Sequence, residues 1–433
     1  MSPRELLVGS FRAALSAADP LAIVPDHLPT PPKGKTVVVG AGKAAAAMAK
    51  AVETHWPAYA PLEGIVITRY AHGYDGSDTE HTQLTRIRVL EAGHPVPDEA
   101  GETAAKEILA LAQSLTADDL LLVLVSGGGS SLLSLPANGI AMADLKAVTS
   151  ALLACGAPIQ EMNIVRKHLS AIQGGRLAAA TKARVSALMI SDVTGDDPSA
   201  IASGPTAPDP STYQDALDIL TAYRIVPPLS VIRHLSNGAR GDVAETLKPG
   251  DAIFSRVENR MIARPYASLS RAAAFFQQRG ITPMILGDSI TGEAREVAKV
   301  HAALARQIQT HHHPLKSPLA IISGGECTVT LRTAGQGRGG RCSEFLLSLA
   351  IDLEGRENIF AIACDTDGID GSEENAGAYL EPGSLARAHA LDANAKSLLG
   401  ANDAYGFFAP LNDLIVTGPT RTNVNDYRAI LVL

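Results

Sequence analysis

Two glycine-rich turns in the first half of the chain have the composition of anion-binding loops. Gly40-Ala41-Gly42-Lys43 follows a short β-branched run, and Ser126–Ser131 has the sequence Ser-Gly-Gly-Gly-Ser-Ser directly after the apolar run Leu120–Val125. Consecutive glycines cost backbone entropy, and they are useful where several N–H groups must face one bound anion. Because a lysine in a first helical turn opposes the helix dipole, Lys43 is either a functional ammonium or a solvated turn lysine. The predicted phosphate-binding residues are Gly42, Ser126, Gly127, Gly128, Gly129, Ser130 and Ser131.

Aspartates gather behind two further apolar runs. One group stands in Ser-Asp-Val-Thr-Gly-Asp-Asp-Pro after Val185–Ile190, and the other in Asp-Thr-Asp-Gly-Ile-Asp-Gly after Ile359–Cys364. Ligands of open α/β sheets collect at the carboxyl ends of strands, and Mg²⁺ takes one or two protein carboxylates together with phosphate oxygens. The first group therefore predicts a metal site at Asp192 and Asp197, with loop capping by aspartate as the equal alternative.

The second aspartate group and a nearby loop predict another set of reactive side chains. Asp365 and Asp367 are interpreted as a site for a hydroxyl-bearing ligand or a metal. Arg338 and Arg341 stand in the loop 335–341, Gly-Gln-Gly-Arg-Gly-Gly-Arg, before an apolar helix pattern. A guanidinium matches the geometry of carboxylates and phosphates, and the alternative is an exposed basic turn. Another basic group, Arg166-Lys167-His168, has two equal interpretations, which are ligand binding and an ordinary amphipathic helix.

Alternating strand and helix patterns must position these residues. The continuous apolar character of Leu120–Val125 is typical of a parallel strand buried on both faces. In the first half we expect helices over about 43–53 and 98–113 and strands over 36–39, 64–68, 86–90, 120–125 and 185–190. This alternation predicts an α/β fold with an open, doubly wound and mostly parallel sheet that has helices on both faces.

The second half of the chain restarts the alternation. We expect helices over about 265–279, 292–311 and 341–353, and strands over 282–286, 319–322, 327–331 and 359–364. Between the halves the pattern breaks near Asn237–Gly241. The sequence therefore predicts two domains, residues 1–237 and residues 238–433.

Composition limits the classes of protein that fit. The 433 residues are 46% hydrophobic and 19% charged, which is a globular composition. A net charge of −8 without a basic stripe argues against nucleic-acid binding. Four cysteines without zinc-ligand spacing predict reduced thiols in a cytoplasmic protein. The N-terminus has an amphipathic helix pattern instead of a signal peptide, and no apolar run is long enough to span a bilayer.

The Gly-x-Gly turn at 40–42 also fits the dinucleotide fingerprint, with Ala45 in third place. Arg69 follows the next predicted strand, where an NAD-binding protein carries an acid, so this interpretation favours NADPH. A P-loop is excluded, because Val37 stands where the motif needs glycine and Ala44 where it needs serine or threonine. The sequence also lacks the usual nucleophile and zinc signatures of hydrolases.

Eight segments, in order along the chain, resemble the class II glycerate kinases, or glycerate 2-kinases, some of which are provisionally labelled hydroxypyruvate reductases. They are VVVGAGKAAAAMA, LVLVSGGGSSLL, NIVRKHLSAIQGGRLA, ISDVTGDDPSAIASGPTAPDP, IISGGECTV, GRGGRCSEFLLSLA, ACDTDGIDGSEENAGA and NDLIVTGPTRTNVNDYRAILV. The resemblance covers about residues 5–433, and about residues 318–433 resemble the MOFRL domain. One departure is Cys342, where the family often has asparagine after the Gly-Gly-Arg arginine.

The resemblance implies ATP- and divalent-metal-dependent phosphorylation of D-glycerate to 2-phosphoglycerate. It also implies an active site in a cleft between the Rossmann-like domain and a C-terminal α/β domain that includes MOFRL. The expected cofactors are ATP and Mg²⁺ or another divalent cation. The expected partners are D-glycerate and ATP, with neither nucleic acid nor membrane, and a homodimer stays open. The competing interpretations are an NADPH-dependent hydroxypyruvate reductase and a non-catalytic nucleotide-binding regulator.

The resemblance ties Lys43 and Arg341 to catalysis. Lys43 would neutralise the transferring phosphoryl group, while Arg341 would hold the glycerate carboxylate or share the phosphoryl charge. Asp365 or Asp367 would orient the C2 hydroxyl and take its proton. Such positioning and charge neutralisation are most of what phosphoryl transfer requires.

Overall fold

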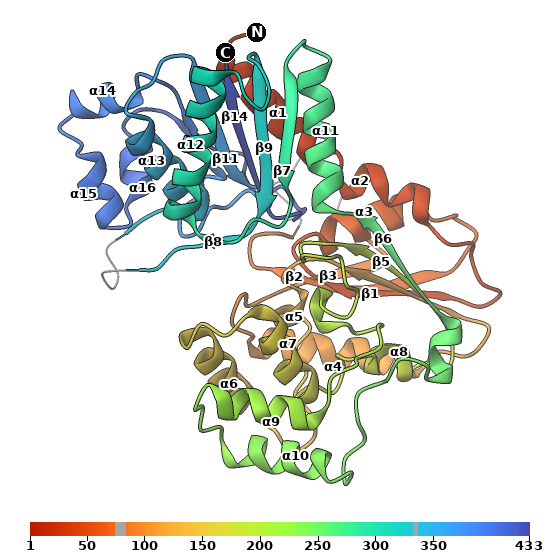
Figure 1. The fold of residues 1–433 in the computed structure, drawn as a ribbon. Helices are drawn as coiled ribbons and strands as arrows, with labels where there is room; N and C mark the ends of the chain where they lie inside the picture. The colour runs from red at the N-terminus through yellow and green to blue at the C-terminus, as the bar shows by residue number, and fades with distance from the viewer. Residues whose placement is uncertain (74–83, 332–336) are drawn as a thin grey trace. The chain divides into compact units, whose positions relative to one another are not determined.

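The structure is a computed structural model that describes residues 1–73, 84–331 and 337–433. The chain forms two compact units: the first unit is Pro20–Ile262, and the second unit combines Met1–Asp19 with Ala263–Leu433. Each unit carries a six-stranded sheet with helices packed on it (Figure 1). The predicted α/β class with two domains is therefore confirmed.

The sheet of the first unit has the strand order β3-β2-β1-β4-β5-β6. The pairings of β2 with β3, β1 with β2, β1 with β4, and β4 with β5 are all parallel. The order reverses direction between β1 and β4, which is where open α/β sheets bind their ligands. The predicted Rossmann-like parallel sheet is thus confirmed. Its strands are β1 Thr36–Ala41, β2 Leu62–Arg69, β3 Ile87–Ala92, β4 Leu120–Val125, β5 Arg184–Ile190 and β6 Val257–Ala263.

Helices cover both faces of this sheet, which explains why β1 and β4 are buried along their whole length. On one face α4 (Glu99–Gln113) packs its apolar side against residues such as Val39 and Val123. The other face carries α3 (Ala45–His55) (Figure 1). Five consecutive small or flexible residues from Ala45 to Ala49 are buried there, so that the helix approaches the strands closely.

A helical segment follows β4 and β5 and packs around a core of its own. It consists of α6 (Met142–Ala154), α7 (Ile159–His168), α9 (Tyr213–Ala222) and α10 (Leu229–Ala239), which share one apolar cluster. The first unit also contains short helical segments, namely α2 Pro20–Ile23, η1 Pro25–His27, α5 Gly129–Leu132, α8 Arg176–Ala179, η2 Ile201–Ser203 and η3 Ala252–Arg256.

The sheet of the second unit is mixed, in the order β13-β12-β11-β14-β9-β7. Strand β14 runs antiparallel to both β11 and β9, while β7 and β9 are parallel. The carboxyl ends of β9 and β11 and the start of β14 therefore meet at one edge of the sheet. The strands are β7 Thr282–Gly287, β9 Leu319–Gly325, β11 Ile359–Asp365, β12 Gly377–Leu380, β13 Leu414–Ile415 and β14 Asp426–Val432, and β8 Gly292–Glu293 pairs separately with β10 Cys327–Thr328.

Successive residues of the second sheet enter two different cores, as the two-residue period of a strand requires. Leu319 and Ile321 face the core with α12 (Ala294–His311) and α13 (Arg341–Leu353), whereas Ala320 and Ile322 face the core with α1 (Pro3–Ser16) and α11 (Pro265–Gln277). Short helices complete the unit: α14 Ser384–His389, α15 Ala395–Gly400 and α16 Ala404–Phe408. No helix among the described residues is long and apolar enough to cross a membrane.

The compact units do not follow the predicted division at residues 237 and 238. Strand β6 lies beyond that point and extends the first sheet, so the first unit continues to Ile262. Helix α1 belongs to the second unit, because Phe11 packs on Tyr427 with ring centroids 5.7 Å apart and Ser10 accepts a hydrogen bond from the Tyr427 hydroxyl at 2.8 Å. Both contacts join segments from opposite ends of the chain, and a local sequence pattern does not reveal such contacts.

Candidate active site

The two glycine-rich turns lie side by side at the point where the strand order reverses. The Gly40–Lys43 turn follows β1 and the Ser126–Ser131 loop follows β4, which are neighbours in the sheet. The amide of Lys43 donates to the carbonyl of Gly127 at 2.9 Å, and the amide of Ala44 donates to Ser126 Oγ at 3.0 Å. These bonds join the turns into one polar surface, here called the β1–β4 loops, at the carboxyl end of the sheet.

Backbone geometry explains two of the glycines in these loops. Gly42 has a φ of 143°, and a Cβ there would lie 2.1 Å from Ser126 Oγ. Gly128 has a φ of 80°, and a Cβ there would lie 3.0 Å from the His94 ring and 3.4 Å from Lys43 Cγ. The structure therefore brings Lys43, a predicted site residue, next to Gly128, another one. It also adds His94, whose short Gly-His-Pro context did not mark it as a site residue.

Half of the amides in the Ser126–Ser131 loop are already used within the protein. Ser126, Gly129 and Ser131 donate to the carbonyls of Ala41, Ser126 and Gly128, respectively. The amides of Gly127, Gly128 and Ser130 donate to no acceptor within the described ranges. Amides left over in one short glycine-rich loop have the arrangement of an anion-binding nest.

The loop after β5 carries the two aspartates that were predicted to bind a metal. Both carboxylate oxygens of Asp197 accept hydrogen bonds from Ser199, one from the amide and one from the hydroxyl, each at 2.8 Å. Asp197 thus performs the loop capping that was the alternative to metal binding. Asp192 is half-buried at the end of β5, and no group of three or more potential metal-binding side chains occurs among the described residues.

A turn with left-handed residues packs against the β1–β4 loops. Ala202 and Ser203 have φ values of 49° and 56° and are followed by Gly204 at 59°. The left-handed conformation is costly for the non-glycine residues Ala202 and Ser203, and such residues cluster at functional sites. The turn packs closely on the loop, because a Cβ at Gly129 would lie 2.6 Å from Ala202 Cβ, and Ser203 Oγ lies 3.0 Å from Ser130 Oγ.

In the second unit, Arg341 is held by three carboxylates at the edge where β9, β11 and β14 meet. It is the first residue of α13. Its Nε donates to Asp426 at 2.8 Å, its Nη2 donates to Asp365 at 2.8 Å, and its Nη1 lies 3.1 Å from Glu326. The register explains the convergence, since Asp365 pairs with Asp426 across β11 and β14, and Glu326 directly follows β9.

The electrostatics of this cluster keep Arg341 charged. Burial by itself lowers the pKa of the Arg341 guanidinium, but Asp426, Asp365 and Glu326 outweigh it and raise the pKa well above the usual value. Asp426 is fully buried and also accepts from Arg428 at 2.7 Å, so one carboxylate joins two arginines. Sequence reasoning missed Asp426 and Arg428. Their signal was an acid and a base two residues apart in an otherwise apolar run.

The carboxylates of the second aspartate group accept hydrogen bonds from nearby backbone amides. Asp365 also accepts the Asp367 amide at 3.0 Å, and Asp367 accepts the Ile369 amide at 2.9 Å. Asp370 caps α13 by accepting the amides of Cys342 and Ser343 at 3.0 and 2.7 Å. Burial raises the pKa of the Asp370 carboxyl, and the bonds from the helix oppose this rise.

The remaining basic residues separate into different roles. Arg338 is exposed and pairs with Asp403 at 3.3 Å, as the basic-turn alternative expects, whereas positions 335 and 336 of its loop lie outside the described residues. Lys167 and His168 belong to the interior of the helical segment: Lys167 Nζ lies 2.6 Å from Asp209, and His168 Nε2 lies 3.2 Å from Glu245.

The fold and these loops define an α/β protein of the Rossmann-like kind with an anion-suited switch point. Comparison with family models matches residues 6–236 to a domain of unknown function, DUF4147, and residues 319–426 to the MOFRL family. A glycerate 2-kinase of Pyrococcus horikoshii is 38% identical over 395 residues, covering 91% of this chain and 86% of the relative. An Agrobacterium vitis protein provisionally named hydroxypyruvate reductase is 49% identical, covering 100% of this chain and 95% of its own.

Solved structures agree with the sequence comparison. The crystal structure of glycerate kinase from Thermotoga maritima matches with a TM-score of 0.85 at 35% identity, covering 99% of each chain. The chain therefore belongs to the family that combines the DUF4147 and MOFRL domains and includes the glycerate 2-kinases. The predicted resemblance is confirmed.

Proposed function

We propose that this protein phosphorylates D-glycerate at the C2 hydroxyl with ATP, giving 2-phosphoglycerate. The observation that carries the proposal is the pair of β1–β4 loops, in which Lys43 stands beside three unused amides at the strand-order reversal. Phosphoryl transfer needs this combination of positioned positive charge and backbone donors, because little covalent chemistry is left to the protein. The glycerate 2-kinase relatives supply the substrate and the reaction class.

The residues receive the following roles in the proposal. The amides of Gly127, Gly128 and Ser130 hold phosphate oxygens of ATP, and Lys43 neutralises the transferred phosphoryl group. Arg341 contributes positive charge for the glycerate carboxylate or for the phosphoryl group. Asp365 or Asp367 orients the C2 hydroxyl and takes its proton. Asp365 is also bound to Arg341, and both carboxylates are almost entirely buried.

The residues present fit a divalent cation that is held mainly by phosphate. Asp192 and Asp197 offer hard carboxylate oxygens at the carboxyl end of β5, and Mg²⁺ usually takes only one or two such ligands from a protein. Asp197 accepts two hydrogen bonds from Ser199, so metal binding at Asp197 would replace those bonds. When bound, the cation would supply charge neutralisation at the phosphates. We also place the protein in the cytoplasm, which the four free cysteines support.

The direct test is to incubate the purified protein with ATP, Mg²⁺ and D-glycerate. We expect ADP release that depends on D-glycerate and on Mg²⁺, and a ³¹P–¹H correlation that assigns the new phosphate to O2. A 3-phosphoglycerate product would refute the regiochemistry.

The second candidate is an NADPH-dependent hydroxypyruvate reductase. It is favoured by the Gly-x-Gly turn after β1, by Arg69 at the end of β2, and by the provisional name of the Agrobacterium vitis relative. It leaves the Ser126–Ser131 loop without a role. NADPH oxidation by hydroxypyruvate, with no ADP release in the kinase assay, would establish it in place of the kinase.

A further inference from the structure

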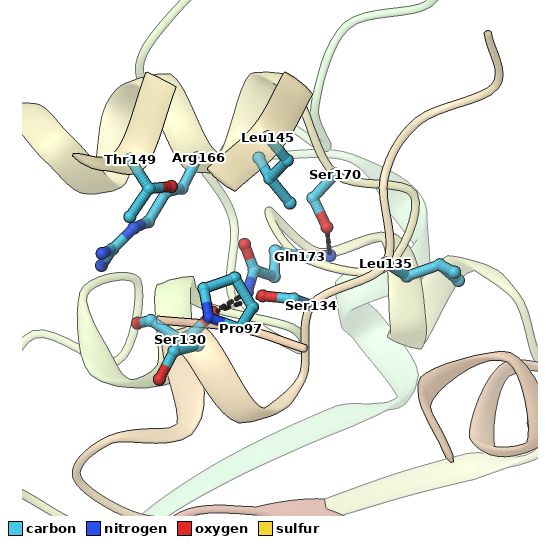
Figure 2. Close-up of a pocket in the computed structure, with 10 residues that line it drawn as sticks. Pro97, Ser130, Ser134, Leu135, Leu145, Thr149, Arg166, Ser170 and Gln173 are labelled. Atoms are coloured by element: carbon cyan, nitrogen blue, oxygen red, sulfur yellow. Dashed lines mark hydrogen bonds between the residues drawn. The ribbon is translucent and has the colours of Figure 1, made fainter. Parts of the chain in front are cut away.

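A small pocket opens beside the β1–β4 loops within the first unit. Its wall combines the start of α5 with side chains from α6 and α7, and Figure 2 shows Arg166 and Thr149 reaching from these helices toward the segment that carries Ser130. Ser170 and Gln173 line the pocket from the segment after α7. Of the lining residues, Ser130 and Ser131 belong to the predicted phosphate-binding loop, and Arg166 belongs to the basic group for which ligand binding was one of two interpretations.

Arg166 differs from its two basic neighbours on α7. Lys167 and His168 have acidic partners at 2.6 and 3.2 Å. Arg166 has no carboxylate partner in the part of the chain that the structure describes, and its guanidinium makes one long contact, 3.5 Å, to Asn163 Oδ1. Burial lowers the pKa of Arg166, and no acidic group raises it. A partly buried arginine without an anion is a site that a ligand anion would stabilise.

The hydroxyls around Arg166 also have hydrogens to donate. Ser170 Oγ accepts the amides of Ile172 and Gln173 at 3.2 and 3.1 Å, which leaves its own proton for another acceptor. Thr149 Oγ1 has no hydrogen-bond partner within the described ranges. A wall with a surplus of donors selects a ligand group that only accepts, which is a carboxylate or a phosphate.

Gln173 adds a single acceptor with a defined orientation. Its side-chain nitrogen donates to the carbonyls of Ser130 and Leu133 at 2.9 and 3.1 Å, so both amide hydrogens are used and the amide cannot be turned around. The Oε1 atom is then available to accept a hydrogen bond. An anion next to a hydroxyl in one small ligand therefore matches both Arg166 and Gln173.

The size of the pocket limits what enters it. It encloses about 10 Å³, which is room for about one water-sized group. A nucleotide base or sugar does not fit, whereas one oxygen of a carboxylate fits with the remainder of the ligand projecting outward. Ser130 lines the pocket, and Gly128, two residues earlier, lies beside Lys43. A three-carbon acid anchored here would therefore extend toward Lys43.

We propose that Arg166, with the hydroxyls of Thr149 and Ser170, binds the carboxylate of D-glycerate and so determines the choice of acceptor. The assignment rests on the proposed kinase function. It gives the carboxylate to Arg166 and leaves the phosphoryl charge to Lys43 and Arg341.

The test compares Arg166→Gln, Thr149→Val and a control, Arg240→Gln. The control removes an arginine of the same unit whose side chain is 63% exposed and pairs with Asp242 at the surface. For Arg166→Gln we expect the KM for D-glycerate to rise at least tenfold, about 1.4 kcal/mol, with the KM for ATP unchanged. Thr149→Val, which keeps the side-chain shape, raises the same KM several-fold, and the control changes neither value.

Binding without turnover separates failure of this assignment from failure of the proposed function. D-glycerate alone should raise the melting temperature of the wild-type protein, and Arg166→Gln should lose that shift while the control keeps it. An unchanged KM and an unchanged shift in Arg166→Gln would overturn the assignment, as would a rise confined to the KM for ATP. A wild-type protein that releases no ADP refutes the kinase reaction, whereas the melting shifts still decide whether Arg166 binds the carboxylate.

Discussion

Replacing Arg341 by lysine tests the carboxylate cluster of the second unit. The arginine fork reaches Asp426 and Asp365 at 2.8 Å through two different nitrogens and Glu326 at 3.1 Å through the third. A lysine has one nitrogen and reaches one of these positions. Glu326 is 56% exposed and loses little, and Asp426 retains Arg428 at 2.7 Å. The net loss is about one charged hydrogen bond, so the free energy of unfolding should fall by about 1.5–3 kcal/mol.

The same variant reports on catalysis. We expect kcat to fall at least about tenfold, or roughly 1.4 kcal/mol of activation free energy, since lysine cannot reproduce the planar fork of Arg341 at the start of α13. Urea unfolding followed by circular dichroism gives the stability, and ADP release gives kcat. Arg338→Lys is the matched control: its side chain is 52% exposed, so both quantities should stay nearly unchanged. Wild-type stability in Arg341→Lys would refute the role of the fork, and wild-type kcat in a folded variant would remove Arg341 from the reaction.

Three other variants test the first unit. Lys43→Met should lower kcat by about 10²-fold or more with little change in melting temperature, because a cation at a helix start does not stabilise the helix. The control Lys33→Met, at an exposed position, should leave kcat unchanged. Wild-type turnover in Lys43→Met would show that Lys43 is a solvated turn residue. Gly128→Ala should lower both stability and ATP affinity, because φ is 80° there; an ATP titration that overlays the wild type would contradict the loop assignment. Burial opposes ionisation of Asp209, but Lys167 lowers the carboxyl pKa below its ordinary 3.8. The stability that this pair contributes is thus present above pH 3.8 and is lost as the pH falls through the folded-state pKa. Asp209→Asn should therefore lower the free energy of unfolding by about 3 kcal/mol at neutral pH and by progressively less in acid. Urea unfolding that shows the same loss at neutral and at acidic pH would refute the pairing.

The local pattern of the chain was sufficient for several elements that carry the site. Strand β4 occupies Leu120–Val125 and α13 occupies Arg341–Leu353, as predicted. In both cases the signal is contained in a few consecutive residues: a continuous apolar run for a strand buried on both faces, and an apolar helical period after paired glycines. Glycine-rich turns after predicted strands also located the β1–β4 loops, because parallel strands place their carboxyl ends at one edge.

Other elements depend on residues far apart in the chain. The expected strand at 327–331 is only Cys327–Thr328, and it pairs with β8 at the start of the expected helix 292–311. Strand β14, which was not expected, lies in the centre of the second sheet. Strand pairing is a choice among partners, and no single segment contains the information that decides it.

The sequence by itself determined the class, the family and the places where chemistry is possible, because apolar periodicity and glycine-rich turns are local properties. It could not decide the partners of the charged side chains. Only the tertiary structure set Arg341 among three carboxylates, capped α13 with Asp370, and gave acids to Lys167 and His168 but none within the described chain to Arg166. Charges in a folded protein act over a few ångströms, and which groups come that close depends on strand order and packing, which the whole chain decides together.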